Sequence, residues 1–371
     1  MKLSKLGKAS LANAAILMTL WLLQRFVAEH TRATTLLTYA PQLPWLLPTF
    51  GLLLGAAWRW RKSRNVRLFA FNGAVLIASA IFLAGYNIAP RGLISHNAVS
   101  HNVMSRAEAS TSTSNGATSN GATSNGATSS TRSTPRVSLR VMTFNIRYGA
   151  DGIEEIAGII RSQKPDVVCL QETLGYTDYP DPIPLLQTRL RDYPFMARTT
   201  EVATFSRLPI VSQFSHSMPF PSSRAMLQTD VDVRGQIFTV YNAHIGMEPA
   251  DDADKAFLQS QPRALQLGGS TRTRQKQVRL ILETVRKTTT PFVVCGDFNI
   301  PPRGLIYRAL SSELTDSFKV AGWGFGHSFH TSAPLLRIDY IWTAPQLRVL
   351  NARVLKVRAS DHRPYIVDLS F

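Results

Sequence analysis

The sequence predicts an α/β globular region that follows a membrane region of about three transmembrane helices. Strand-like and helix-like stretches alternate along residues 136–371, which is typical of α/β proteins. Residues 1–94 instead contain uncharged stretches long enough to cross a bilayer. The expected strands are 139–144, 167–170, 238–243, 291–295 and 365–369, and the expected helices are 153–162 and 273–287.

Three stretches of residues 1–94 are expected to cross the membrane, at 11–28, 35–58 and 68–89. The third has 22 residues without a charge, enough for a helix through the hydrocarbon core. The second is interrupted by Pro41, Pro44 and Pro48. The first is more polar, and a signal peptide is its alternative interpretation.

Basic residues give the expected orientation. Lys2, Lys5 and Lys8 precede the first span, and five Lys and Arg residues at 59–67 separate the second from the third. Because positive residues mark the cytoplasmic side, three spans would place everything after Ala89 outside the cytoplasm.

Residues 95–135 are expected to be a flexible tether between the membrane region and the globular part. The sequence Ser-Asn-Gly-Ala-Thr occurs there three times, at 114–118, 119–123 and 124–128. These small and polar residues cannot offset the entropy of ordering the chain by burial.

The formal net charge of +17 arises mostly before the globular part. Residues 1–135 hold 13 of the 41 basic residues but only 2 of the 24 acidic ones. The modest excess left in residues 136–371 neither demands nor excludes nucleic acid as a partner. Cys169 and Cys295 each end an apolar run, so we expect two small buried hydrophobes, although a disulfide between them stays open.

Polar residues follow the ends of the predicted strands. The run Pro291–Cys295 leads through a glycine to Asp297 and Asn299, which point to the same side of the chain. Alone, this pattern indicates either an active-site corner or a turn. The other polar residues at such positions are Asn145, Glu172, His244, Asp339, Asp361 and His362.

If these strands are neighbours, one sheet edge gathers four carboxylates, two histidines and two amides. Oxygen ligands without thiolates suit a hard cation such as Mg²⁺ or Mn²⁺. Histidines suit proton transfer and the stabilisation of developing negative charge. The set therefore fits hydrolysis of a phosphate ester by metal-activated water.

Six motifs of the globular part occur in the order seen in the endonuclease/exonuclease/phosphatase superfamily, which residues 138–371 resemble. They are Thr143–Arg147, Leu170–Glu172, Asn242–His244, Gly296–Asn299, Arg337–Tyr340 and Ser360–His362. The resemblance implies a deoxyribonuclease I-like sandwich of two packed mixed β-sheets flanked by helices, in four layers. It also implies a hydrolase of phosphate ester bonds, and the membrane region looks like that of bacterial members anchored in the inner or plasma membrane.

The resemblance implies roles for the residues at the strand ends. Glu172 would be the principal ligand of Mg²⁺ or Mn²⁺, with Asn145 close to metal and phosphate and Asp361 on the metal side. Asp297 would orient or deprotonate the attacking water, and Asn299 would hold that water or the phosphate.

The remaining motifs imply contacts with the phosphate. His244 would contact the scissile phosphate, and Asp339 would pair with His362 and determine its tautomer and charge. The stretch Val202–Ile210 resembles a further strand of the family, and Arg207 within it is either a phosphate contact or a member of a surface ion pair.

The expected partners are the lipid bilayer, through residues 1–94, and a phosphoester: nucleic acid, a phospholipid headgroup or a small phosphodiester. The catalytic domain is expected to be monomeric. Residues 246–271 are either a rim over the substrate or a solvated insertion. The basic helix 272–287 is either a face for anionic partners or the solvent face of a packed helix.

Two other functional classes are weighed against the enzyme. One is a catalytically silent, membrane-anchored binding or scaffold domain of the same fold, against which the complete set of polar residues argues. The other gives the membrane part its own transport or sensing role, against which the scarcity of charges within the spans argues.

Overall fold

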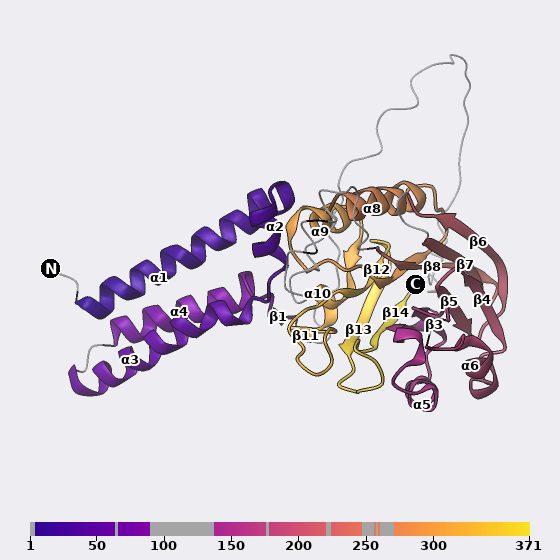
Figure 1. Cartoon of the computed structure of the whole chain (residues 1–371), viewed down its shortest axis with the longest axis horizontal. Coiled ribbons are helices and arrows are strands. Elements are labelled where there is room, and N and C mark those ends of the chain that lie inside the picture. The colour runs from indigo at the N-terminus through magenta and orange to yellow at the C-terminus, as the bar shows by residue number, and fades with distance from the viewer. Residues whose placement is uncertain are drawn as a thin grey trace, which may run out of the picture.

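A helical N-terminal region and a rounded α/β body make up the chain (Figure 1). The computed structural model describes residues 4–63, 66–89, 137–175, 178–219, 224–246 and 271–371, with positions 256 and 259 in isolation. The predicted tether, 95–135, lies outside the described residues, as does nearly all of the polar stretch 246–271.

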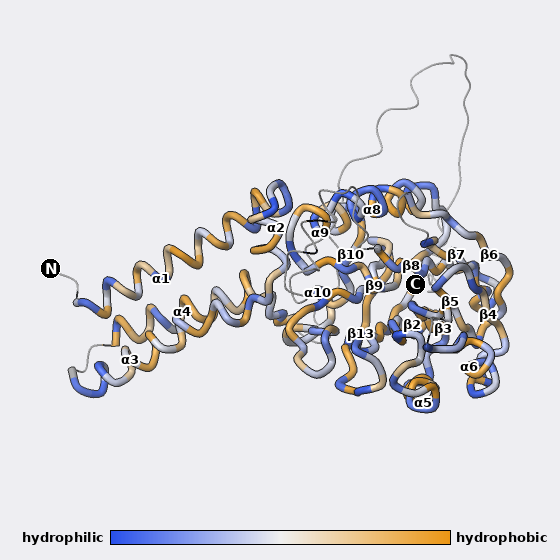
Figure 2. The backbone as a smooth tube through the Cα atoms, viewed as in Figure 1, coloured by the Kyte–Doolittle hydropathy of each residue, from blue (hydrophilic) through white to orange (hydrophobic). Residues whose placement is uncertain are grey.

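The N-terminal region consists of helices that lie side by side and project from the body (Figure 1). Their apolar residues form most of the helices, and hydrophilic residues gather at the two ends, one remote from the body and one next to it (Figure 2). The elements are α1 (Lys5–Leu22), a π-helical turn (Leu23–Val27), a 3-10 turn (Ala28–His30), α2 (Arg32–Tyr39), a second 3-10 turn (Leu43–Leu46), α3 (Leu47–Ser63), α4 (Arg67–Phe82) and β1 (Asn87–Ile88).

The expectation of three membrane spans is wrong for the described residues. One helix there, Lys5–His30 with 26 residues, is long and apolar enough to cross a membrane. The stretch 35–58 is divided between α2 and α3, which has 17 residues, and 68–89 yields only the 16 residues of α4. A span needs about 20 residues, so these helices are too short. The helix Lys5–His30 is long enough, but a signal sequence near the N-terminus can have the same length and composition.

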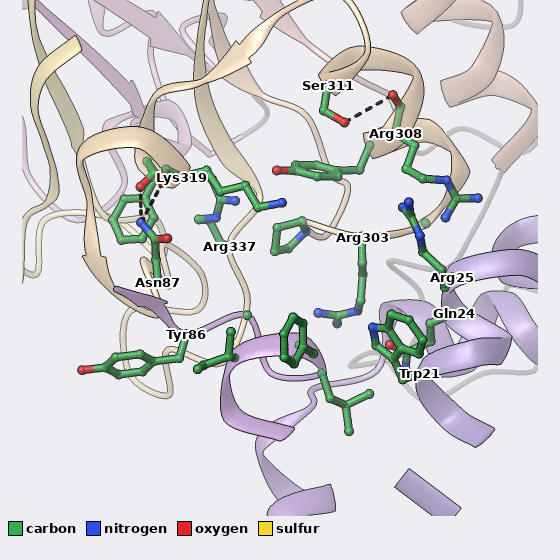
Figure 3. Close-up of a pocket in the computed structure, with 18 residues that line it drawn as sticks. Trp21, Gln24, Arg25, Tyr86, Asn87, Arg303, Arg308, Ser311, Lys319 and Arg337 are labelled. Carbon is green, nitrogen blue, oxygen red and sulfur yellow. Dashed lines mark hydrogen bonds between the residues drawn. The ribbon is translucent and has the colours of Figure 1, made fainter. Parts of the chain in front are cut away.

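The N-terminal region contacts the body directly, so the linker is not the sole connection that the sequence suggested. The guanidinium of Arg303 donates from Nε to the carbonyl of Thr38 at 2.6 Å and from Nη2 to that of Ala40 at 3.0 Å. Strand β1 pairs antiparallel with β11 (Trp323–Gly324). Asn87 donates from Nδ2 to the carbonyls of Phe318 and Lys319, and Figure 3 shows this contact together with Arg303.

Two six-stranded mixed sheets form the centre of the body, with the orders β10-β12-β9-β8-β7-β6 and β13-β14-β2-β3-β5-β4. The pairs β8–β9 and β2–β3 are parallel, and the other neighbours are antiparallel. The first sheet contains β6 (Ile210–Ser217), β7 (Ala225–Val233), β8 (Gln236–His244), β9 (Phe292–Asp297), β10 (Thr315–Asp316) and β12 (Asp339–Thr343). The second contains β2 (Ser138–Asn145), β3 (Val167–Gln171), β4 (Phe195–Thr199), β5 (Val202–Ser206), β13 (Arg348–Val354) and β14 (Tyr365–Ser370).

Alternation along each strand explains the layers. Val141 and Cys169 face the first sheet, whereas their neighbours Met142 and Leu170 join a separate cluster with helices α5 and α6. The outer helices are α5 (Ile153–Gln163) and α6 (Ile183–Arg189) on the second sheet, and α8 (Thr271–Val285) and α9 (Gly304–Ser311) on the first. The arrangement confirms the predicted sandwich of two mixed sheets between helices.

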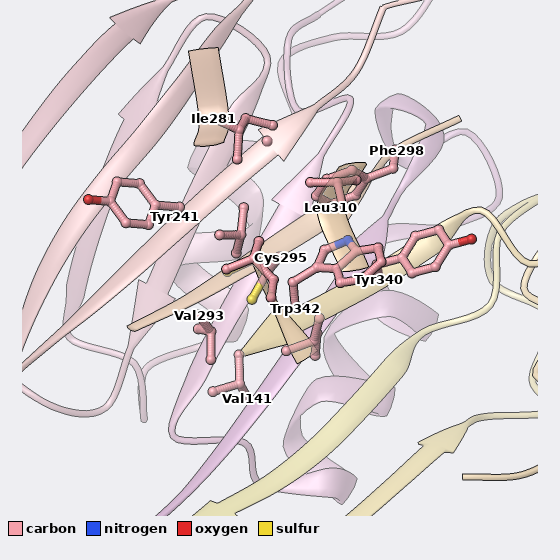
Figure 4. Close-up of a cluster of buried hydrophobic side chains, with 14 of the residues drawn as sticks. Val141, Tyr241, Ile281, Val293, Cys295, Phe298, Leu310, Tyr340 and Trp342 are labelled. Carbon is pink, nitrogen blue, oxygen red and sulfur yellow. The ribbon is translucent and has the colours of Figure 1, made fainter. Parts of the chain in front are cut away.

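The main core fills the space between the sheets and beneath α8 and α9. Figure 4 shows Val141 of the second sheet near Val293 and Trp342 of the first, with Ile281 of α8 and Leu310 of α9 beyond. Trp342 has no exposed surface. Cys169 and Cys295 are both buried and free, as small hydrophobes.

Asn242 ties the two sheets together with hydrogen bonds near the ends of β3 and β8. Its Nδ2 donates to the carbonyls of Leu170 at 3.1 Å and Ala203 at 3.0 Å. Its Oδ1 accepts from Gln171 Nε2 at 2.7 Å. All of these atoms are buried, where a satisfied polar network favours one relative position of the sheets.

A second buried contact, between Asp316 and Arg337, supports the first sheet. Arg337 donates from Nη1 and Nη2 to the two oxygens of Asp316 at 3.0 and 2.6 Å. Asp316 also caps α10 (Ser317–Ala321) by accepting from the backbone of Phe318. The Arg337 guanidinium lies 4.6 Å from the centre of the Tyr340 ring.

We predict that Arg337→Met destabilises the fold by about 3–5 kcal/mol, because it leaves a buried carboxylate without its partner. The double change Arg337→Met and Asp316→Asn should recover most of this loss, since asparagine is neutral and still caps a helix. Urea unfolding of the full chain in mild detergent measures both. A cost below about 1 kcal/mol for the single change would show that the pair contributes little.

Candidate active site

Asp297 ends β9 between two other strands that carry site residues. In the parallel pairing with β8 it lies opposite His244, and in the antiparallel pairing with β12 it lies opposite Asp339. The preceding Gly296 has φ +146°, and a Cβ there would lie 1.7 Å from the carbonyl oxygen of Ala243. A glycine is therefore required for β9 to come this close to β8.

One oxygen of Asp297 is the point at which the site converges. Its Oδ2 accepts a hydrogen bond from Asn145 Nδ2 at 3.1 Å. It lies 3.6 Å from His244 Nε2 and 3.6 Å from His362 Nε2. Asp297 is only 1% exposed, and burial together with the charge of Asp339 raises the pKa of its carboxyl although both histidines act against this.

Asn299 is held beside the same carboxylate. Its backbone N–H donates to Asp297 Oδ1 at 3.0 Å, which closes a turn with φ +49° at Asn299. Its Nδ2 donates to the carbonyl of Ile245 at 3.0 Å and lies 3.4 Å from His244 Nε2. The Asp-x-Asn corner is thus both a turn and part of the site, the two interpretations that the sequence left open.

His362 and Asp339 form the buried pair that the resemblance implied. His362 Nδ1 lies 2.9 Å from Asp339 Oδ2 and 3.2 Å from Oδ1, so Nδ1 is the donor and Nε2 faces Asp297. The ring of Phe329 lies 4.8 Å from that of His362. Burial acts to lower the pKa of His362, but Asp339 and Asp297 outweigh it and raise this pKa to about 10.

His244 has a carboxylate partner that the sequence motifs did not indicate. Its Nδ1 lies 3.2 Å from Glu201 Oε2, and Arg224 Nη1 lies 3.0 Å from Glu201 Oε1. Burial and Arg224 act to lower the pKa of His244, but Glu201 and Asp297 outweigh them and raise it. Glu201 is a single acidic residue just before β5, so only the fold reveals its place.

Asn145, Glu172 and Asp361 form a group of oxygen-bearing residues beside Asp297. Asn145 Nδ2 donates to Glu172 Oε1 at 2.9 Å as well as to Asp297. The hydroxyl of Ser360 lies 2.8 Å from the carbonyl oxygen of Asn145 and 3.2 Å from Asp361 Oδ1. Glu172 has φ +54°, an uncommon conformation for a residue with a side chain.

Comparison with known proteins agrees with this geometry. Residues 142–362 match the Endonuclease/Exonuclease/phosphatase family. The chain belongs to the endonuclease/exonuclease/phosphatase family. Members of this family are phosphoester hydrolases. No curated protein matches the chain.

Solved structures are similar to this endonuclease/exonuclease/phosphatase domain. A family member from Beutenbergia cavernae is 23% identical with a TM-score of 0.50, over 63% of this chain and 72% of that one. A mannosyl-6-phosphatase from Bacteroides thetaiotaomicron is 19% identical with a TM-score of 0.48, over 63% of this chain and 100% of that one. D. rerio TDP2 complexed with single strand DNA product is 15% identical with a TM-score of 0.47, over 62% of this chain and 98% of that one.

The residues of this family member fit a divalent cation. Asp297, Asp339 and His362 are buried, and their ligand atoms lie within 4.8 Å of one another. Glu172 and Asp297 both face one amide nitrogen, that of Asn145, and no ion pair to Glu172 is present in the described part of the chain. Carboxylate and amide oxygens are the ligands that Mg²⁺ and Mn²⁺ prefer.

The structure places two basic residues, Arg207 and Arg274, away from the positions that the sequence suggested for binding an anionic substrate or partner. Arg207 follows β5 at the end that pairs with the start of β3, and its N–H donates to the carbonyl of Asp166. The site lies at the opposite end of β3, so the structure does not bring Arg207 to the phosphate position. In the helix predicted at 272–287, Arg274 is fully buried with its guanidinium 4.7 Å from the centre of the Tyr39 ring, so that helix is not simply a solvated basic face.

We predict that Asp339→Asn lowers the pKa of His362 by about 1–3 units, because one of the two facing charges is removed. The pKa in the folded state is about 10, above the unfolded value of about 6.5. The charged pair therefore contributes stability that is fully present below about pH 6.5 and is lost as the pH rises through about 10.

NMR titration of the full chain with ¹⁵N-labelled histidine measures the shift, and urea unfolding across the same pH range measures the stability. Asp192→Asn, at an exposed position beyond α6, is the matched control and should change neither. A His362 titration that is identical in the wild type and in Asp339→Asn would contradict the assignment of Asp339 as the partner.

Proposed function

We propose that this chain is a membrane-attached, metal-dependent phosphoesterase that hydrolyses a phosphodiester or phosphomonoester by attack of water. The observation that supports this best is the convergence of Asn145, His244 and His362 on one oxygen of the buried Asp297. A buried carboxylate with this many polar neighbours has the character of a general base rather than of a structural residue.

Asp297 would accept the proton of the attacking water at Oδ2. The raised pKa of its carboxyl makes it a better base than an exposed aspartate. Asn299 keeps the other oxygen, Oδ1, engaged through its backbone N–H. Asn145 and the side chain of Asn299 border the same space and would orient the water and the phosphate.

His362 and His244 would stabilise negative charge on the phosphate. Asp339 holds the Nδ1 proton of His362, so that its Nε2 proton points into the site and can bind a phosphate oxygen. A pKa of about 10 keeps this imidazole positively charged at neutral pH. Glu201 orients His244 in the same manner from the opposite side.

Glu172, Asn145 and Asp361 would hold Mg²⁺ or Mn²⁺. When bound, the cation would neutralise phosphate charge and lower the pKa of coordinated water. We place the cation on these residues because Asp339 already engages His362 with both oxygens. Loss of activity in a chelator, and its return with Mg²⁺ or Mn²⁺, would support the proposed metal dependence.

The proposed substrate is a phosphoester, such as nucleic acid, a phospholipid headgroup or a small phosphoester. The complete set of polar side chains, each with a partner in the site, opposes the alternative of a catalytically silent scaffold. Such a scaffold would have no need for a buried carboxylate that faces two histidines at its sheet edge.

The N-terminal region supports a membrane location, because polar side chains lie between its helices and apolar side chains lie on its outer surface. Asn72 Nδ2 donates to Ser10 Oγ at 3.0 Å, and Asn13 Nδ2 to Thr49 Oγ1 at 2.8 Å, so polar side chains meet between the helices. Large apolar side chains are exposed on the outside, as in membrane proteins. These exposed residues are Leu11, Ile16, Met18, Phe26, Phe50, Leu54, Ile77 and Phe82.

The same contacts favour a retained anchor over a cleaved signal peptide, because α1 packs on α3 and α4 through Ser10 and Asn13. Lysines 5 and 8 begin α1 at the end remote from the body (Figure 1). If that end is cytoplasmic, the catalytic body lies outside the cytoplasm of a bacterial inner or plasma membrane.

We predict that Asp297→Asn lowers kcat/KM by about 10²–10⁴-fold, because amide nitrogen and oxygen cannot accept the proton of water. His362→Ala should lower it by about 10²–10³-fold through loss of a charged donor. The assay uses the full chain with Mg²⁺ or Mn²⁺, and offers bis-p-nitrophenyl phosphate, p-nitrophenyl phosphate, plasmid DNA and sphingomyelin.

The matched control is Arg207→Ala, which removes a charge at the far end of β5 and should leave kcat/KM unchanged. If Asp297→Asn retained full activity, or if no phosphoester were hydrolysed with either metal, the proposal would be rejected.

A further inference from the structure

A cavity of about 470 Å³ lies between the N-terminal helices and the body, away from the residues that surround Asp297. Figure 3 shows it lined by Arg25 of the π-helical turn after α1, by Arg308 of α9 and by Lys319 of α10. No acidic side chain is found among the lining residues that the structure describes. The cavity is therefore strongly basic.

The cations of the cavity differ in their partners. Arg303 donates hydrogen bonds to the carbonyls of Thr38 and Ala40, and Arg337 donates to the carboxylate of Asp316. Within the described residues, no salt bridge involves the remaining three cations, which are Arg25, Arg308 and Lys319.

Arg25 and Arg308 lie next to each other at one side of the cavity (Figure 3). Burial and the nearby charge of Arg25 lower the pKa of Arg308, although Glu29 acts in the opposite direction. Glu29 itself is engaged by the N–H of Leu305 at 2.6 Å. Two guanidinium groups at such a position repel each other, and an anion between them would relieve this repulsion.

An apolar groove leads away from this cavity between α1 and α4. It has a volume of about 360 Å³ and shares Trp21, Phe82 and Leu83 with the cavity. Its other lining residues include Leu17 and Val75. A basic cavity is thus adjacent to an apolar groove along two helices that expose large apolar side chains.

We propose that this cavity and groove form a binding site for an anionic phospholipid. The phosphate of the headgroup would lie between Arg25 and Arg308, with Lys319 near the rest of the headgroup. An acyl chain would lie along the groove past Trp21 and Phe82. The proposal builds on the proposed membrane attachment of α1, but it does not require catalysis.

The groove favours a lipid over other anions of the same chemistry. Inorganic phosphate or glycerol 3-phosphate would use the cations but would leave the groove without an occupant. A nucleic acid would require an extended basic surface, whereas this cavity has a volume of only about 470 Å³ and is partly lined by Trp21, Phe82 and Leu83. A lipid bound in this site would contact both the N-terminal helices and the body, and would therefore stabilise their association.

The test uses the full chain in a neutral maltoside detergent and native mass spectrometry with added dioleoylphosphatidylglycerol or dioleoylphosphatidylcholine. We expect one phosphatidylglycerol to be retained, at least about tenfold more strongly than phosphatidylcholine, because charge-assisted contacts differ between the headgroups. Arg25→Gln with Arg308→Gln should weaken retention by about tenfold or more. Ala78→Phe, which fills the groove, should weaken it as well.

Arg61→Gln with Lys62→Gln is the matched control, since it removes two charges at the remote end of α3 and should leave retention unchanged. Asp297→Asn should also retain the lipid, which separates this site from the catalytic one. Equal retention of both lipids, or full retention by Arg25→Gln with Arg308→Gln, would overturn the proposal. Equally strong binding of glycerol 3-phosphate that Ala78→Phe does not affect would overturn it in favour of a soluble anion.

Discussion

The close approach of β8 and β9 at Gly296 is the constraint on which the rest of the site depends. It places Asp297 in register with His244 on one side and with Asp339 on the other. A buried carboxylate at that point is costly unless polar groups face it. Asn145 of the second sheet provides one such group. The polar environment of Asp297 therefore depends on the relative position of the two sheets.

Buried charges near the site are sorted into separate pairs. Arg337 engages Asp316, so Asp339 is free to pair with His362. Glu201 faces both His244 and Arg224. The loop after Asn299 then continues to Arg303, which holds the N-terminal helices through two backbone carbonyls. The active-site corner and the membrane-proximal contact therefore lie on one short segment, and the body has a defined orientation relative to α1.

Much of this could be predicted from the sequence, because apolar runs that end in polar residues identify buried strands and their functional ends. The strands before Asn145, Glu172, His244 and Asp297 were all expected near their observed bounds. Pairing across strands is not visible in such runs, so Glu201 was missed. Helical periodicity likewise cannot show that a distant helix covers Arg274, or how soon a helix such as α4 ends.

The measurement that tests the central claim most directly is the fate of ¹⁸O during turnover of the full chain in H₂¹⁸O. If Asp297 acts as a base toward water, the phosphate product acquires ¹⁸O. Mass spectrometry of the peptide that carries Asp297 then shows no ¹⁸O after many turnovers. Incorporation of ¹⁸O into the carboxylate of Asp297 would show that water attacks the carbonyl carbon of an acyl phosphate and that the phosphate leaves, and would contradict the role assigned to this residue.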